Sequence, residues 1–335
     1  MENSQLQEPL AAARFIKVIG RGKDGARSMN RDDACLLYGA MLDGRVTDLE
    51  LGAILLSMRI KGESIDEIAG FLDAAEASFA PLSAPADGQY APIVIPSYNG
   101  ARKLPNLTPL LAILLAREGA PVLVHGVLHD VGRVTTAEIF VALDMPVAHS
   151  VAEAEARFSQ HAPAFLPIDV LAPKMARLLS LRRILGVRSS THTLVKIIQP
   201  FQEPVLRLSS YTHSEYLDML GRYFTTLAPA QRGDVFLMRG TEGETVASVK
   251  RAQSIDWFHE GQRTTLVEKQ LVADAAPDVP VERDAQTTAL WIRRVLADEL
   301  PVPTAISEQV AQCLQVAKMV RERRAVECTV DCADA

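Results

Sequence analysis

Apolar positions in the first eighty residues recur at helical spacing, with polar residues between them. Two of these segments open with a capping box, in which a Thr or Ser side chain and a Glu three residues later bind backbone N–H groups of the first turn. The boxes are Thr47 with Glu50 and Ser64 with Glu67, and an earlier helix is predicted over about residues 32–42. This part of the chain is therefore predicted to be helical.

From residue 92 the pattern changes to short apolar runs separated by helical segments. Strands are expected at 93–95, 122–124, 146–148, 205–208 and 234–238, with further β-like segments at 245–249 and 264–268. Helices are expected at 107–116, after the capping box of Thr135 with Glu138, and at 215–224, 286–296 and 308–323. Because parallel strands need such crossovers, the alternation predicts an α/β domain with a doubly wound sheet.

Composition indicates a globular protein of the cytoplasm. Hydrophobic residues make up 48% of the 335 residues, and no run of 18 apolar residues could span a membrane. The first residues lack the basic and then apolar order of a signal peptide, and four cysteines suit a reducing compartment. Cys328 and Cys332 have no histidine nearby, so we interpret them as plain thiols and expect no metal site.

The formal net charge of −6 argues against a polyanionic partner only if the charge is spread evenly. Residues 170–202 contain no Asp or Glu and six cations, namely Lys174, Arg177, Arg182, Arg183, Arg188 and Lys196. The glycine-rich turn at residues 20–25 contains Arg21 and Lys23, and it forms a second basic group with Arg14, Lys17, Arg27 and Arg31. This turn lacks the ending of a nucleotide-binding P-loop, and a solvated helix end is its alternative interpretation.

The connection after the first predicted strand is a candidate ligand loop, because it follows the carboxyl end of a strand in an α/β sheet. It consists of Pro96, Ser97, Tyr98, Asn99 and Gly100, followed by Arg102 and Lys103. A single glycine gives little room for a backbone cradle around phosphate, so either the two cations attract an anion or the turn is simply solvated. The sequence contains neither the HExxH motif of zinc metalloproteases nor the Gly-x-Ser-x-Gly motif of α/β-hydrolases. It therefore gives no support for either class of enzyme.

The order of segments resembles the anthranilate phosphoribosyltransferase and pyrimidine nucleoside phosphorylase superfamily. Residues 59–63, 124–126 and 181–188 carry this resemblance. It implies a small all-helical domain, residues 1–84 joined by helices of about 173–200, beside a larger doubly wound α/β domain of residues 85–172 and 201–335. It also implies a cleft between these domains and a homodimer formed through the helical domains.

The catalytic motifs of these enzymes are not retained. Residues 96–100 stand where the enzymes have a Gly-Thr-Gly-Gly-Asp loop for pyrophosphate, and the magnesium-binding Asp-Glu pair falls on Thr245 and Val246 by ungapped matching. Arg182 matches an arginine that contacts anthranilate in the enzymes. Because phosphoryl-type substrates need charge neutralisation and a backbone cradle, we expect no catalytic residues, no cofactor and no metal.

Residues 19–23, 92–103 and 186–196 resemble the YbiB-type branch of TrpD-like proteins. This resemblance implies binding of DNA or RNA without sequence preference, along a basic groove of the homodimer, with transferase activity lost. The expected nucleic-acid-binding residues are Lys17, Arg21, Lys23, Arg27, Arg102, Lys103, Arg182, Arg183, Arg188, His192 and Lys196. The alternatives are a phosphoribosyltransferase with an altered substrate and a scaffold whose cations bind acidic proteins.

Overall fold

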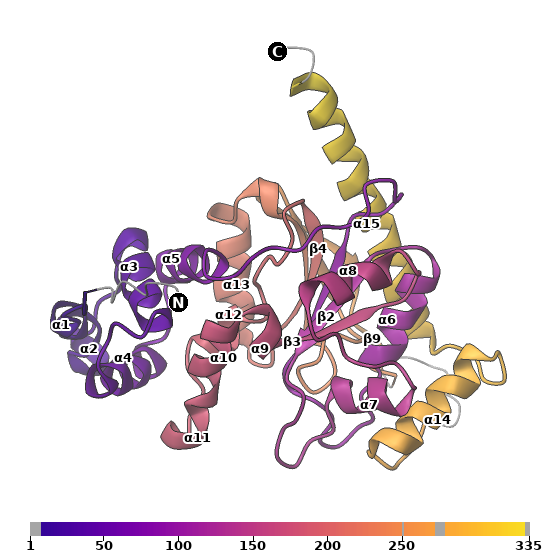
Figure 1. Cartoon of the computed structure of the whole chain (residues 1–335), viewed down its shortest axis with the longest axis horizontal. Helices are drawn as coiled ribbons and strands as arrows, with labels where there is room; N and C mark the ends of the chain where they lie inside the picture. The colour runs from indigo at the N-terminus through magenta and orange to yellow at the C-terminus, as the bar shows by residue number, and fades with distance from the viewer. Residues whose placement is uncertain (1–7, 250, 272–278, 332–335) are drawn as a thin grey trace, which may run out of the picture. The chain divides into compact units, whose positions relative to one another are not determined.

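The computed structural model describes residues 8–249, 251–271 and 279–331, and the chain divides into two compact units (Figure 1). The helical unit comprises residues 1–80 and 172–198, and the α/β unit comprises residues 81–171 and 199–335. Cys332 lies outside the described residues. A small helical domain and a larger α/β domain were predicted from the sequence, and this fold class is confirmed.

The helical unit contains eight helices within the described residues. They are α1 (Ala13–Ile19), α2 (Gly22–Gly25), α3 (Arg31–Leu42), α4 (Asp48–Lys61), α5 (Ile65–Glu76), α10 (Pro173–Ser180), α11 (Arg182–Leu185) and α12 (Thr191–Leu194). Both predicted capping boxes are present, that of Thr47 with Glu50 at the start of α4 and that of Ser64 with Glu67 at the start of α5.

Glu67 does more than cap its own helix. Its fully buried carboxylate accepts hydrogen bonds from the backbone N–H groups of Ser64 (2.8 Å) and Met29 (3.0 Å) and from Lys61 Nζ (2.6 Å). A buried carboxylate is costly unless charge and hydrogen bonds compensate it, and here both do. This glutamate therefore joins the end of α4, the start of α5 and the segment before α3.

The closest helix contact in this unit joins α3 and α5. The rings of Tyr38 and Phe71 stack across it with centroids 5.0 Å apart. Gly70 permits this approach, because a Cβ at that position would lie 2.1 Å from the backbone oxygen of Arg31. The glycine is thus required by close packing of two helices rather than by its backbone dihedrals.

The second segment of the helical unit returns to the first through polar contacts. Tyr38 donates a hydrogen bond from its hydroxyl to Thr191 Oγ1 (3.0 Å), with both side chains buried. Arg177 donates to the backbone oxygen of Met41 at the end of α3, and Lys174 forms an ion pair with Asp43 at 2.7 Å. Helices α10 and α12 are therefore integral parts of a unit that is discontinuous in sequence.

The α/β unit is built on a seven-stranded mixed sheet. In spatial order the strands are β3 (Ala164–Pro167), β2 (Val122–Gly126), β1 (Ile93–Ser97), β4 (Val205–Ser210), β5 (Gly233–Met238), β7 (Ile255–His259) and β8 (Gln262–Val267). The first five are parallel, and β7 and β8 extend the sheet as an antiparallel hairpin. A separate two-stranded sheet pairs β6 (Arg251–Ala252) with β9 (Gln270–Leu271).

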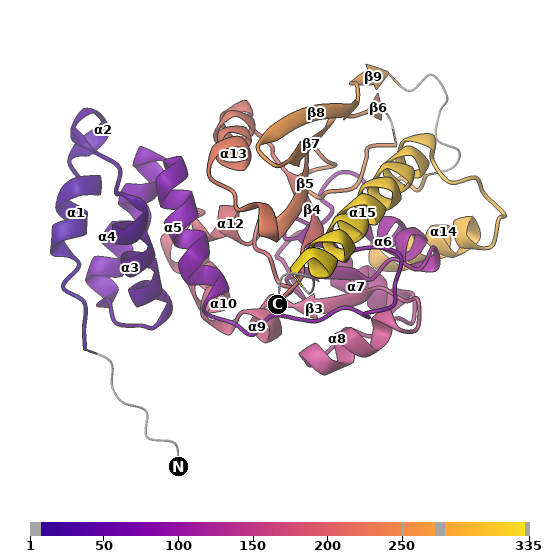
Figure 2. The ribbon, with the colours of Figure 1, turned by 90° about the horizontal axis from the view of Figure 1, so that it is seen from above.

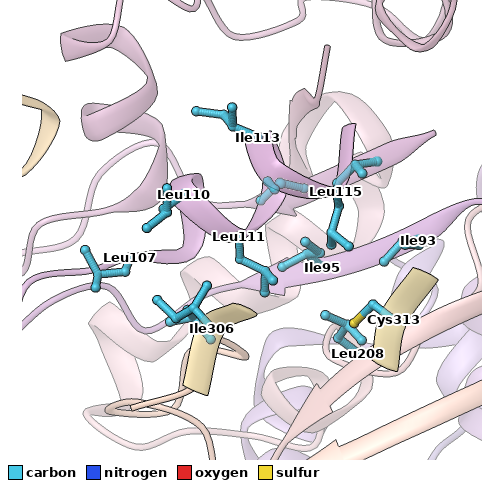
Figure 3. Close-up of a cluster of buried hydrophobic side chains, with 14 of the residues drawn as sticks. Ile93, Ile95, Leu107, Leu110, Leu111, Ile113, Leu115, Leu208, Ile306 and Cys313 are labelled. Carbon is cyan, nitrogen blue, oxygen red and sulfur yellow. The ribbon is translucent and has the colours of Figure 1, made fainter. Parts of the chain in front are cut away.

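Helices cover both faces of this sheet (Figure 2). They are α6 (Thr108–Arg117), α7 (Thr136–Ala142), α8 (Val151–Phe158), α9 (Ile168–Leu171), α13 (Ser214–Thr226), α14 (Ala285–Leu296) and α15 (Thr304–Asp331), with a 3-10 turn at Ala230–Arg232. Figure 3 shows the core on one face, where Ile95 of β1, Leu111 of α6 and Cys313 of α15 lie in one cluster. On the other face Phe224 of α13 packs on Phe258 of β7, as alternation along the strands requires.

Two predicted strands are wrong. Residues 146–148 are not a strand, although Ala148 donates one hydrogen bond to the backbone oxygen of Phe165 in β3. Residues 245–249 are held instead by the side chain of Gln309, which accepts from the N–H of Ala247 (2.8 Å) and donates to the oxygen of Thr245 (2.7 Å). The sequence pattern also missed β3, β7 and α8.

Among the described residues, no helix is both long enough and apolar enough to cross a lipid bilayer.

We predict that Gly70→Ala destabilises the helical unit by about 1–3 kcal/mol, because the added methyl group overpacks the α3–α5 contact. Gly39→Ala is the matched control, since the nearest atom to its added Cβ, in Ala74, lies 3.8 Å away at ordinary contact distance. Denaturant unfolding of both variants measures the difference. Equal midpoints for the two variants would contradict the packing argument.

Candidate functional site

The candidate ligand loop follows β1 at the carboxyl edge of the parallel strands, as predicted. Ser97 is the last residue of β1, and Gly100 has a φ of +64°. A Cβ on Gly100 would lie 2.7 Å from the backbone oxygen of Val134, so the turn requires glycine for both conformation and space. Two N–H groups of this turn, those of Asn99 and Gly100, follow each other directly along the backbone.

These N–H groups already have an anionic partner in the chain. Glu244 Oε1 accepts hydrogen bonds from the N–H groups of Asn99 and Gly100, each 2.7 Å long. Asn99 Nδ2 donates to the backbone oxygen of Gly243 (2.7 Å), and Ser210 Oγ donates to that same oxygen (2.6 Å). The Glu244 side chain is buried, so the carboxylate replaces solvent at the tip of β1.

Glu242 binds the next part of the loop in the same way. Its carboxylate accepts from the N–H groups of Arg102 (2.9 Å), Lys103 (2.9 and 3.1 Å) and Leu104 (3.0 Å). Partial burial acts to raise the pKa of Glu242, but these hydrogen bonds and the nearby charge of Arg133 outweigh it and lower the pKa below its ordinary value. The Glu242 carboxylate is therefore stabilised in its charged form.

The two glutamates come from one tight turn between β5 and β6. Glu242 itself has a φ of +54°, and Gly240 and Gly243 have φ values of +63° and +93°. A residue with a side chain is disfavoured in this left-handed region by about 1–2 kcal/mol. The hydrogen bonds accepted by the Glu242 carboxylate offset that cost.

Tyr98 of the loop contacts a histidine at the end of the neighbouring strand β2. Tyr98 hydroxyl and His125 Nδ1 are 2.7 Å apart, with His125 fully buried and Tyr98 half-buried. Burial lowers the pKa of His125 to about 3, whereas burial and then the charge of Glu244 raise the pKa of Tyr98. Both groups are uncharged at neutral pH, so neither supplies positive charge to an anion at this loop.

In the helical unit, four of the predicted nucleic-acid-binding residues lie together on α11, α12 and the adjoining turns. Burial and then the charges of Arg188, Arg182 and Lys196 together lower the pKa of His192 to about 4. The N–H of Ser189 donates to His192 Nδ1 (3.1 Å), which leaves Nε2 to carry the proton of the neutral ring. We call Arg182, Arg188, His192 and Lys196 the basic cluster.

Two other cations of the same segment have partners in residues 41–43. Lys174 is paired with Asp43, and Arg177 binds the carboxyl end of α3. The count of six cations in residues 170–202 therefore overstates the charge that this segment presents, because a sequence count cannot include partners from residues 41–43. Arg183, on α11, is exposed.

The remaining predicted residues lie in other places. Lys17 is in α1, Lys23 in α2 and Arg21 between these helices, and both helices pack on α4 rather than on α10 or α5. Arg21 and Arg27 donate to backbone oxygens of their own turn, Lys17 and Asp24 respectively. Arg102 and Lys103 have exposed side chains in the α/β unit.

Glu242 and Glu244 were not predicted from the sequence as partners of the ligand loop. Their turn was interpreted only as the place where a metal-binding pair is lost, and the residues that they bind lie about 140 positions earlier. The available signal was two glutamates flanking a glycine in a turn that follows a sheet strand. Thr245 and Val246, which match the metal pair, are buried. Among the described residues, no group of three or more His, Cys, Asp or Glu is arranged to hold a metal ion.

Comparison with known proteins agrees with the fold. The helical bundle domain of the glycosyl transferase family matches residues 14–78. The chain is 24% identical over 291 residues to anthranilate phosphoribosyltransferase of Rhodopseudomonas palustris (strain BisA53), covering 84% of this chain and 82% of the enzyme. The solved structure of that enzyme from Thermus thermophilus superposes with a TM-score of 0.64 at 19% identity, covering 94% and 90% of the two chains.

A second solved structure is the Saccharomyces cerevisiae enzyme in complex with PRPP and Mg, with a TM-score of 0.64 at 13% identity, covering 94% of this chain and 95% of the enzyme. At such identity the likeness establishes the fold alone. A much nearer relative is the uncharacterized protein YbiB of Escherichia coli (strain K12), 45% identical over 303 residues that cover 90% of this chain and 92% of YbiB. The chain therefore belongs to the YbiB family, which has the fold of anthranilate phosphoribosyltransferase.

Proposed function

We propose that this protein binds nucleic acid without sequence preference, as a homodimer in the cytoplasm, and that it has lost transferase chemistry. The observation that carries the proposal is the basic cluster of Arg182, Arg188, His192 and Lys196 on consecutive short elements of the helical unit. Cations that contact phosphates release condensed counterions, which favours binding irrespective of base sequence. In the proposed groove, each protomer contributes its cluster, with Arg183 beside it.

His192 has a different role from the cations. With its pKa near 4 it is neutral at physiological pH, so it contributes a hydrogen-bond donor at Nε2 rather than a charge. The salt dependence of binding then reflects the arginines and the lysine. Cations together with a neutral hydrogen-bond donor suit recognition of the nucleic-acid backbone. The cations attract the phosphates, and the neutral donor fixes the position of a phosphate oxygen.

The homodimer part of the proposal is supported by α4, which is apolar on two faces. Leu51, Ile54, Leu55 and Met58 are buried inside the unit, whereas Leu49, Leu56 and Ile60 are 86%, 48% and 64% exposed. At 100° per residue, these three exposed residues share one side of the helix. An exposed apolar stripe of this kind is typical of a contact with a second copy.

The alternative is a phosphoribosyltransferase with an altered substrate, favoured by identity to anthranilate phosphoribosyltransferases. Two observations weigh against it. The loop N–H groups already bind Glu242 and Glu244, and apolar Val246 stands at a position matched to a metal ligand. The residues present do not fit PRPP and Mg, the ligands of the yeast structure.

We predict that binding of oligonucleotides falls steeply with salt, with a slope of log K against log[salt] of roughly −5 for about six phosphate contacts. The double variant Arg188→Gln, Lys196→Gln reduces the magnitude of this slope by about 2 and weakens three unrelated sequences equally. Lys174→Gln is the matched control, because Lys174 lies in α10 outside the basic cluster and pairs with Asp43 at the end of α3, so its loss leaves the slope unchanged. Fluorescence anisotropy at several salt concentrations measures both slopes. An unchanged slope in the double variant, or loss for one sequence alone, would refute the electrostatic model.

We predict that Leu56→Asp with Ile60→Asp converts the dimer to a monomer, since two carboxylates cannot be desolvated in an apolar interface. Val131→Asp serves as control, because Val131 is 96% exposed and lies in the α/β unit. Sedimentation velocity gives the mass of each variant. A wild-type monomer, or a dimer that survives both substitutions, would reject this interface.

We predict no magnesium-dependent release of pyrophosphate from phosphoribosyl pyrophosphate with anthranilate or other aromatic amine acceptors. A coupled pyrophosphate assay measures the reaction. Pyrophosphate release that depends on both the protein and an acceptor would favour the phosphoribosyltransferase alternative over the proposed loss of transferase activity.

A further inference from the structure

Five backbone N–H groups within six residues of one loop bind carboxylate oxygens. They belong to Asn99, Gly100, Arg102, Lys103 and Leu104, with donor–acceptor distances between 2.7 and 3.1 Å. The partners are the side chains of Glu242 and Glu244. Rows of backbone N–H groups of this kind form concavities that bind anions.

The positive potential of this loop is reinforced by side chains. Arg133 donates to the backbone oxygen of Asn99 (2.8 Å), and its charge lowers the pKa of Glu242. Arg102 and Lys103 carry exposed cationic side chains on the same loop. Arg133, which also lies 3.9 Å from Asp130, and the five N–H groups thus favour negative charge at this place.

The carboxylate of Glu244 is also held in surroundings that stabilise negative charge. Its side chain is 1% exposed, Oε1 accepts the N–H groups of Asn99 and Gly100, and Oε2 is buried without a hydrogen-bond partner. Burial of a carboxylate is unfavourable unless its surroundings stabilise negative charge. The approach is also close, because a Cβ on Gly243 would lie 2.6 Å from Asn99 Nδ2.

We propose that residues 97–104 form an oxyanion-binding seat that the chain fills with two of its own carboxylates, and that removal of Glu242 and Glu244 opens it to an inorganic oxyanion of the phosphate class. The two glutamates act as tethered anions whose local concentration exceeds that of millimolar free phosphate. In the wild-type protein the seat is therefore closed to external phosphate. This inference does not rest on nucleic-acid binding, since its residues all lie in the α/β unit.

The test uses the full chain with Glu242→Ala and Glu244→Ala, and inorganic phosphate as the probe. We expect phosphate to bind the double variant at least about tenfold more tightly than the wild type, because vacated N–H groups form charge-assisted hydrogen bonds with it. Its melting temperature then rises with phosphate concentration, beyond the change seen with sodium chloride at equal ionic strength. Glu118→Ala, at an exposed position after α6, controls for the lost negative charge.

Single variants keep the test decisive if the double variant does not fold. Glu242→Ala vacates the N–H groups of Arg102, Lys103 and Leu104 and leaves buried Glu244 in place. Glu242→Gln keeps a tethered neutral acceptor there, so it binds phosphate less tightly than Glu242→Ala. Isothermal titration compares the two. A folded Glu242→Ala protein whose phosphate affinity equals that of the wild type overturns the proposal, and the glutamates are then structural ties only.

Discussion

Backbone N–H groups at the ends of helices and strands must find acceptors, and at several places in this chain a glutamate side chain provides one. Glu50 and Glu138 do so in capping boxes, and Glu67 extends the same role to a segment 38 residues away in sequence. Glu242 and Glu244 apply it to the turn after β1. One requirement, that buried donors be paired, thus organises the helix starts of both units and the candidate ligand loop.

The separation along the chain between a backbone N–H group and its glutamate acceptor decides which of these contacts could be predicted from the sequence. Capping boxes join residues three positions apart, so Thr47 with Glu50 and Ser64 with Glu67 were visible in the pattern. Strands β1, β2, β4 and β5 were visible as short apolar runs between helices. The contact of Glu244 with Asn99 spans 145 positions, and no local periodicity encodes it.

The errors have the same origin. Residues 245–249 have the composition of a strand, but the side chain of Gln309 provides their hydrogen bonds. Lys174 and Arg177 looked like members of a basic surface, but residues 41–43 engage them. For the candidate site, sequence identified the ligand loop and the stretch that contains the basic cluster, whereas the internal carboxylates became evident only in three dimensions.

The fold of this molecule does not by itself determine what its ligand loop binds. The sheet, the helical unit and the position of the loop after β1 agree with the fold of anthranilate phosphoribosyltransferase, while the residues at the loop tip bind a different kind of anion, one provided by the chain itself. A site can change its chemistry through two side chains on a neighbouring turn while the scaffold that positions it is kept.

The discontinuity of the helical unit has a consequence for biosynthesis. Tyr38 is translated long before Thr191, its buried hydrogen-bond partner, and the α/β residues 81–171 are made between them. At about 5–20 residues per second, helices α1 to α5 wait several seconds or more on the ribosome before α10 and α12 can cover them. The helical unit can therefore be completed only after the α/β residues 81–171 have been synthesised, so its first helices lack their partners α10 and α12 throughout that interval.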